Sequence, residues 1–155
     1  MMVEAPLSRY TRNSFIIYVA ACLIGAAWFA YDGYFNQTFI SKHTDEQGRA
    51  DFDLAFNRAA PPFLLAGAVL LAGYFLAIRN RKLVADDDAL AAGKETIPYD
   101  AIEKIDKTFF EKKGYFIITY TRNGVETRRK LTDRQFDNLP AILDLLVAKI
   151  TQDQT

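Results

Sequence analysis

Two long runs of apolar residues stand out in the first half of the chain. Residues 15–31 carry no charged side chain, and residues 59–78 form a second charge-free run. An α-helix rises about 1.5 Å per residue, so roughly 20 residues cross the hydrocarbon core of a bilayer. We therefore predict a hairpin of two transmembrane helices, residues 15–35 and 59–78. Trp28 and Tyr31, near the end of the first run, are typical of a membrane interface.

The first run has a competing interpretation as a cleaved signal sequence, because Arg9 and Arg12 supply a basic flank. Its apolar stretch, however, exceeds the roughly 7–15 residues usual in a signal sequence and continues through Trp28 and Phe29. Two buried core helices are a further alternative, but so short a chain has too little polar surface to cover them. Membrane spans are therefore favoured. The consecutive prolines at positions 61 and 62 are expected at the start of the second helix, where a missing N–H costs nothing.

Beyond residue 81 the pattern changes to short, partly alternating runs that predict strands. The acidic triplet from Asp86 to Asp88 is a turn signal, and Ile97 is kept extended by the proline that follows it. Asn123-Gly124 is the strongest short-range signal for a tight hairpin turn. The predicted strands are residues 82–85, 89–92, 96–99, 102–110, 115–121 and 125–131.

If Asn123 and Gly124 form a two-residue loop, Arg122 pairs with Val125 and the faces of both strands follow. The inward face then holds Phe116, Ile118, Tyr120, Thr127, Arg129 and Leu131. Arg129 is the polar exception on this face. Either its guanidinium reaches water at the rim of the sheet, or it contacts a carboxylate or another anion.

The last part of the chain predicts a helix that covers the sheet. Apolar residues recur every three or four positions up to Ile150. Thr132 and Gln135 fit a capping box, while Pro140 indicates that the regular helix begins near Leu139. The expected fold class is thus a membrane α-helical hairpin plus an α+β domain, with a small antiparallel sheet or partial barrel closed by a C-terminal helix.

Part of this second half resembles bacterial membrane-anchored pleckstrin-homology-like domains. The resemblance rests on Leu83-Val84-Ala85-Asp86, on residues 97–105 and 109–114, and on the closing helix. It covers residues 79–150 and implies a domain that often follows a pair of transmembrane helices. It also implies an interaction or assembly module. Eukaryotic relatives bind phosphoinositides through a basic first hairpin, whereas Asp86 to Asp88 would repel phosphate here.

Basic residues set the expected orientation of the hairpin. They flank its two outer ends, while acidic residues outnumber basic ones in the connecting loop. Because Lys and Arg favour the cytoplasmic side, both termini are expected there, in a bacterial cytoplasmic membrane. The expected segments are a cytoplasmic N-terminus (1–14), the first span (15–35), an external loop (36–58), the second span (59–78), a cytoplasmic domain (79–150) and a tail (151–155).

Charge and composition narrow the function classes. Nineteen Lys and Arg residues balance nineteen Asp and Glu residues, so there is no field to gather nucleic acid. Cys22 and His43 each stand alone in the sequence, which argues against a cysteine–histidine metal site. No nucleophile–base pair or phosphate loop is recognisable, so we expect neither an enzyme nor a cofactor.

The leading hypothesis is a membrane-anchored interaction or assembly module, an accessory or scaffolding subunit of a membrane complex. Its expected partners are the lipid bilayer and other membrane or cytoplasmic proteins, including further copies of itself. The alternative is a peripheral lipid- or anion-sensing domain. The candidate anion or partner contacts are Arg122, Arg128, Arg129 and Lys130, and the candidate helix-packing residues are Ala21, Gly25, Ala68 and Ala72. The small residues are also simply common in membrane helices.

Overall fold

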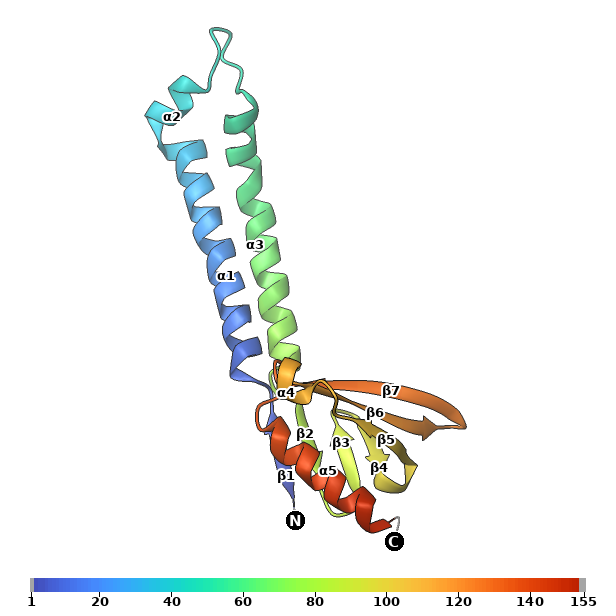
Figure 1. Cartoon of the computed structure of the whole chain (residues 1–155). Helices are drawn as coiled ribbons and strands as arrows, with labels where there is room; N and C mark the ends of the chain where they lie inside the picture. The colour runs from blue at the N-terminus through green and yellow to red at the C-terminus, as the bar shows by residue number, and fades with distance from the viewer. Residues whose placement is uncertain (1, 154–155) are drawn as a thin grey trace. The chain divides into compact units, whose positions relative to one another are not determined.

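The structure is a computed structural model that describes residues 2–153 (Figure 1). The chain divides into two compact units. One is residues 13–77, and the other combines the residues up to Arg12 with those from Ile78 onward. The first is helical and the second is α+β. Of the expected tail, residues 154 and 155 lie outside the described residues.

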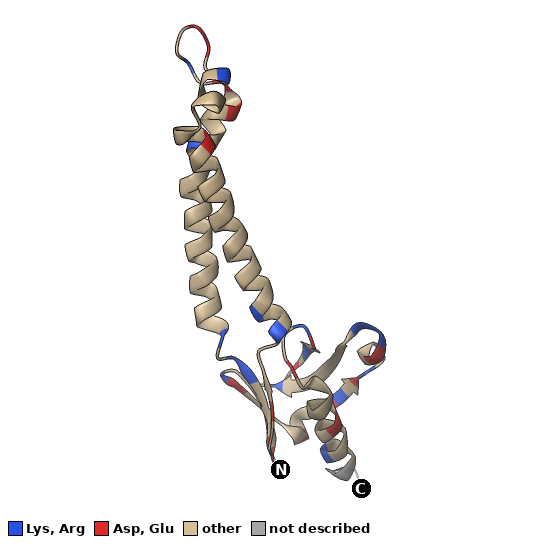
Figure 2. Ribbon diagram, turned by 90° about the vertical axis from the view of Figure 1, so that its left-hand side faces the viewer, with Lys and Arg blue, Asp and Glu red and all other residues tan. Residues whose placement is uncertain are grey.

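The helical unit is built around two long apolar helices, α1 (Arg9–Ala30) and α3 (Phe52–Ile78). A π-helical turn, η1 (Tyr31–Phe35), extends α1, and the short helix α2 (Gln37–Lys42) follows. The continuous segments Arg9–Phe35 and Phe52–Ile78 each have 27 residues, long and apolar enough to cross a membrane. Figure 2 shows both helices without charged residues along most of their length.

Aromatic contacts join α1 and α3 into an antiparallel hairpin, and the two helices run side by side in Figures 1 and 2. The Phe15 ring lies 5.7 Å from the rings of both Tyr74 and Phe75, measured between centroids. Toward the other end, Phe29 and Phe56 meet edge to face at 5.5 Å. Large rings at both ends therefore hold the pair together.

The sequence predicted that Pro61 and Pro62 start the second long helix. They instead lie inside α3. A proline inside a helix frees the carbonyl four residues before it. The carbonyl of Arg58, freed by Pro62, accepts a hydrogen bond of 3.0 Å from the Tyr34 hydroxyl. The π-helical turn of the hairpin thus supplies the donor that α3 lacks.

Gly33 allows this close approach of η1 to α3. A Cβ atom at Gly33 would lie only 3.0 Å from the carbonyl of Asn57, which Pro61 leaves without its helical donor. The Nε of Arg58 donates to the carbonyl of Gly33 at 2.9 Å. The prolines are tolerated because the preceding turn of chain packs directly against the backbone they disrupt.

The α+β unit contains two antiparallel sheets. The first has the order β1-β2-β3-β4 and the second the order β5-β6-β7. Among residues 2–153 no strand ladder joins the two sheets into a closed barrel. The strands are β1 (Val3–Pro6), β2 (Lys82–Ala85), β3 (Ala89–Ala92), β4 (Glu95–Pro98), β5 (Ile102–Asp106), β6 (Tyr115–Arg122) and β7 (Val125–Thr132).

Strand β1 was missed by the sequence analysis, which treated residues 1–14 as a flank. It pairs with β2, and Ala5 is fully buried in the core. The next residues are tied down as well, because the amide of Ser8 donates to the carbonyl of Gln135 at 2.8 Å. Four residues ending in Pro6 are too short for a periodic signal, and the partner strand is far away in sequence.

The β6–β7 hairpin confirms the predicted register. Arg122 pairs with Val125, and Asn123 (φ 51°) and Gly124 (φ 77°) both adopt the left-handed conformation of a type I′ turn. The predicted inward side chains Phe116, Ile118, Tyr120 and Leu131 are buried. The alternation of side chains along β6 and β7 therefore predicted correctly which residues face the core.

Two local predictions were wrong. Strand β5 ends at Asp106 rather than at residue 110, because the Asp106 carboxylate accepts the amide of Thr108 (3.0 Å) and starts a turn. The short helix α4 (Phe110–Lys113) follows. Thr132 does not cap a helix; it ends β7, and its carbonyl accepts the amides of Gln135 and Phe136 in a turn.

The C-terminal helix α5 (Leu139–Asp153) begins where Pro140 indicated. Its apolar side packs into a single core with side chains from both sheets. The largest fully buried residues of this core are Leu83, Leu90, Ile97, Phe116, Ile118, Leu131, Leu139, Ile142 and Leu146. One helix thus covers the apolar faces of two sheets that no strand ladder joins among residues 2–153.

Candidate functional site

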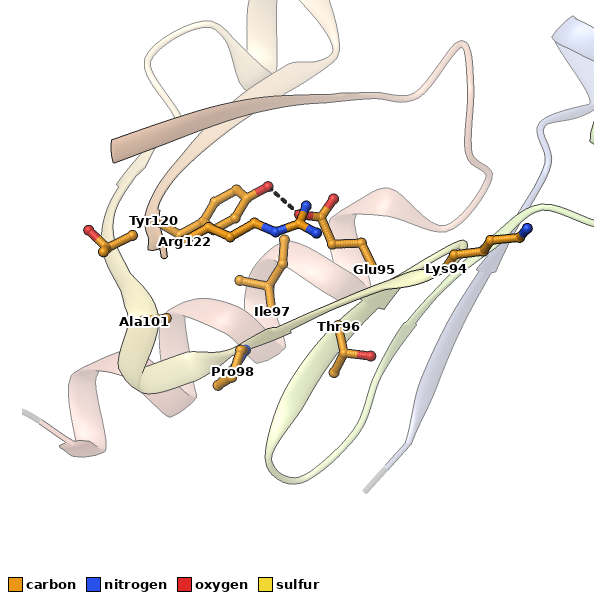
Figure 3. Close-up of a pocket in the computed structure, with 9 residues that line it drawn as sticks. Lys94, Glu95, Thr96, Ile97, Pro98, Ala101, Tyr120 and Arg122 are labelled. Carbon is orange, nitrogen blue, oxygen red and sulfur yellow. Dashed lines mark hydrogen bonds and ion pairs between the residues drawn. The ribbon is translucent and has the colours of Figure 1, made fainter. Parts of the chain in front are cut away.

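A pocket of about 170 Å³ opens between β4 and β6 of the α+β unit (Figure 3). Its polar centre is Glu95 at the start of β4, opposite Tyr120 and Arg122 on β6. Its lining residues are Lys94, Glu95, Thr96, Ile97, Pro98, Ala101, Tyr120, Thr121 and Arg122. Because β4 belongs to the first sheet and β6 to the second, the pocket lies where the two sheets separate.

The Glu95 carboxylate joins the two sheets through three donors. Its Oε1 accepts the Tyr120 hydroxyl at 2.8 Å and Nη1 of Arg122 at 2.9 Å. Its Oε2 accepts Nη1 of Arg129 at 2.6 Å. Because Glu95 and Arg129 are half-buried, the charge-assisted bond between them is stronger than one in open water, and it stabilises the contact between the two sheets.

Burial raises the pKa of the Tyr120 hydroxyl, and the hydrogen bond to Glu95 and the charge of that carboxylate raise it further. Tyr120 is therefore a protonated donor at neutral pH. One carboxylate then faces two guanidinium groups, and the cluster of Glu95, Arg122 and Arg129 carries a net charge of +1.

The four candidate contact residues on the last hairpin separate into two sets. Arg122 and Arg129 both contact the Glu95 carboxylate. Of the two interpretations offered for Arg129, exposure at the rim or contact with an anion, the structure therefore favours contact with a carboxylate. Arg128 pairs with Glu126 at 3.3 Å, and the ammonium of Lys130 lies 3.8 Å from the centre of the Tyr115 ring. The alternation of β7 places this second pair on the opposite face of the sheet.

The candidate helix-packing residues of the hairpin differ in burial. Ala68 is buried, Gly25 and Ala72 are half-buried, and Ala21 is exposed. A Cβ atom at Gly25 would lie 3.4 Å from a methyl group of Leu64, which is ordinary contact distance. The small residues thus do not form one continuous strip in the contact between α1 and α3.

A group of possible metal ligands lies in the loop between α2 and α3. His43, Asp51 and Asp53 each offer one ligand atom, and these atoms lie within 4.8 Å of one another. Nδ1 of His43 is 2.6 Å from Asp51 and 3.9 Å from Asp53. Sequence reasoning missed the group because His43 is the only histidine. The amide of Leu54 and the His43 side chain lower the pKa of Asp51, which also binds the first turn of α3.

The acidic β2–β3 turn is held by its own backbone. The amides of Asp88 and Ala89 donate to the Asp86 carboxylate and lower its pKa. The hydroxyl of Tyr99 donates to the carbonyl of Asp86 at 2.8 Å. Burial, and then the charges of the three aspartates, raise the pKa of Tyr99 to about 12.

Comparison with protein-family models, with curated proteins and with solved structures gave no match to this chain.

Proposed function

We propose that this chain is an integral membrane protein whose apolar hairpin anchors a pleckstrin-homology-like interaction module. In this role it is an accessory or scaffolding subunit of a membrane complex. The apolar surface of the hairpin supports membrane insertion. Ile17 is 63% exposed, Leu70 73% and Phe63 76%, and lipid would solvate these side chains.

The observation that carries the proposal is the pairing of β1 with β2. Strand β1 ends just before α1, and β2 begins just after α3. Because the two strands pair, both ends of the apolar hairpin connect to the same folded unit. Two membrane spans also return the chain to the side from which it started, so the strand pairing fits such a hairpin. The flanking Arg and Lys residues favour the cytoplasmic side.

The strand order supports the pleckstrin-homology-like assignment. Antiparallel strands that end in the β6–β7 hairpin and a closing C-terminal helix agree with the order of elements that the resemblance implies. The segment from residue 79 onward contributes the six strands β2 to β7, and β1 adds a seventh strand from before the hairpin. The hairpin is then an insertion between the first two strands of the domain.

The distribution of charge favours a protein partner over a phosphoinositide. The turn between β2 and β3 carries Asp86, Asp87 and Asp88, and these three carboxylates would repel a phosphate group there. Arg122, Arg128 and Arg129 each pair with a glutamate of this chain. Strand β7, by contrast, is an edge strand and offers backbone donors and acceptors to another protein.

Two measurements on the full chain test the proposal. In bacterial cells the protein should stay with membranes after alkaline extraction, and a reporter at its C-terminus should be active only in the cytoplasm. After solubilisation in mild detergent it should elute as a complex with further copies or with other proteins. A chain soluble without detergent, or an external reporter, would refute the membrane topology. A strict monomer without bound protein would refute the interaction module.

A further inference from the structure

We infer that the pocket between β4 and β6 binds an acidic side chain of a partner protein through the guanidinium of Arg122. This inference rests on the proposed function and assigns a contact site to it. Arg122 and Glu95 both line the pocket, and Figure 3 shows the Arg122 side chain reaching toward Glu95. Arg129 contacts the same carboxylate from β7.

The size of the pocket selects a small group. Cofactors and drug-sized ligands occupy pockets of roughly 300–1,000 Å³. The 170 Å³ here suits one side chain better than a nucleotide or an inositol phosphate. Ile97, Pro98 and Ala101 provide an apolar wall for the methylene groups of a glutamate. Figure 3 shows these residues on the side of the pocket below Tyr120 and Arg122.

The charge balance selects a monoanion. Glu95 neutralises one of the two guanidinium groups that contact it, and Lys94 extends away from the cluster in Figure 3. One additional carboxylate would bring the net charge of +1 to zero, whereas a doubly charged phosphate would leave an excess of negative charge. Glu103, which accepts the Thr121 hydroxyl, repels both kinds of anion, but it repels a dianion more strongly than a monoanion.

Arg122 is the accessible member of the cluster. Its side chain is 61% exposed, against 28% for Arg129 and 23% for Glu95. A guanidinium has five N–H donors in a planar fork and forms paired bonds with a carboxylate. Arg122 can therefore bind a second carboxylate while Arg129 and Tyr120 keep Glu95 paired. The buried part of the cluster remains intact when the partner binds.

The test uses the isotope-labelled full chain in detergent, with N-acetyl-glutamate methylamide as the probe. Its glutamine counterpart and inorganic phosphate serve as comparison ligands. We expect the glutamate probe to shift the amide signals of Ile97, Thr121 and Arg122 with a dissociation constant in the millimolar range, as suits a fragment. The glutamine compound should give no saturable shift, and phosphate should bind at least threefold more weakly.

Variants locate the site. Arg122→Gln should weaken binding of the glutamate probe at least tenfold, whereas Lys104→Gln, which removes an exposed charge elsewhere in the domain, should change it less than twofold. Equal binding of the glutamine compound, tighter binding of phosphate, or no effect of Arg122→Gln would each overturn the inference.

The detergent-solubilised complex separates this inference from the proposed function. Arg122→Gln should reduce the amount of co-purifying protein, and an unchanged complex would refute the pocket as a partner contact. A monomeric wild-type chain that still binds the probe through Arg122 would contradict the proposed function but not the carboxylate site.

Discussion

The hairpin and the α+β unit use apolar side chains in opposite ways. In the hairpin, large apolar residues such as Ile17, Phe63 and Leu70 are more than half exposed. In the α+β unit, residues of similar size such as Phe116 and Leu90 are completely buried. The hydrophobic effect gives the α+β unit a core of its own, whereas the hairpin leaves much of its apolar surface exposed, which is why we propose that lipid surrounds it.

The two units also differ in where their backbone hydrogen-bond partners come from. An α-helix satisfies its backbone within one segment, and in α3 the carbonyl of Arg58, freed by Pro62, instead accepts the Tyr34 hydroxyl of η1. The strands of the α+β unit depend on partners elsewhere, in one case from the other end of the sequence. Substitutions in the two units should therefore have different consequences.

The largest effect is expected from Phe116→Ala, which removes a fully buried ring that contacts Phe110 edge to face. A core truncation of this kind costs about 3–5 kcal/mol of unfolding free energy. Hydrogen exchange of the β6 and β7 amides should accelerate in the full chain in detergent. Leu70→Ala, on the exposed surface of α3, should leave this exchange unchanged. Equal exchange rates in Phe116→Ala and wild type would contradict the assigned core.

Leu70→Asp tests directly what surrounds the hairpin. At the centre of a membrane span an aspartate costs about 2.5–3.5 kcal/mol, so the share of protein inserted into membranes should fall. The matched change Val125→Asp, at an apolar residue of similar exposure in β7, should change stability by no more than about 0.5 kcal/mol. Normal insertion of Leu70→Asp would indicate that water, not lipid, surrounds this face of α3.

Arg129→Gln tests the contact between the two sheets. The change removes the 2.6 Å ion pair between Arg129 and the Glu95 carboxylate, which is only 23% exposed. Glu95 then keeps only Arg122 and Tyr120 as partners. We expect a loss of about 1–3 kcal/mol in unfolding free energy, measured by urea titration in detergent. Arg128→Gln, which breaks an exposed ion pair, is the control and should cost less than about 1 kcal/mol.

The smallest effect concerns alkaline pH. The pKa of Tyr99 is raised from 10.0 to about 12, so the folded chain holds this proton more tightly than the unfolded chain does. The resulting stabilisation is complete below pH 10 and is lost as the pH rises toward 12. By pH 11 the unfolding free energy should fall by about 1 kcal/mol. Tyr99→Phe should flatten this decline, and an equally steep decline in that variant would contradict the assignment.

Local patterns explain which parts of the fold could be predicted. The β6–β7 register followed from Asn123-Gly124, because a two-residue turn determines which residues face each other across the hairpin. The start of α5 near Leu139 followed from Pro140 in the same way. The end of β5 was wrong because the Asp106 side chain, which binds a backbone amide two residues later, outweighed the apolar residues beyond it.

The candidate site was only half predictable. Arg129 stood out as a charged residue on an inward face, and Arg122 was among the candidate contacts. Glu95 was not identified, because a single glutamate between a turn and a short strand carries no periodic signal. The contact of β4 with β6 arises only when the two sheets share a core and α5 covers both.

The sequence alone determined features that depend on near neighbours: the apolar helices, most of the strands, the tight turn of the last hairpin and its inward face. The tertiary structure decided what depends on distant segments: the pairing of β1 with β2, the convergence of Glu95 with Arg122 and Arg129, and the donor that η1 offers to α3. The physical reason is the distance along the sequence over which each interaction acts. Periodicity and turn chemistry act over a few residues, whereas these pairings form between segments that only burial in a common structure brings together.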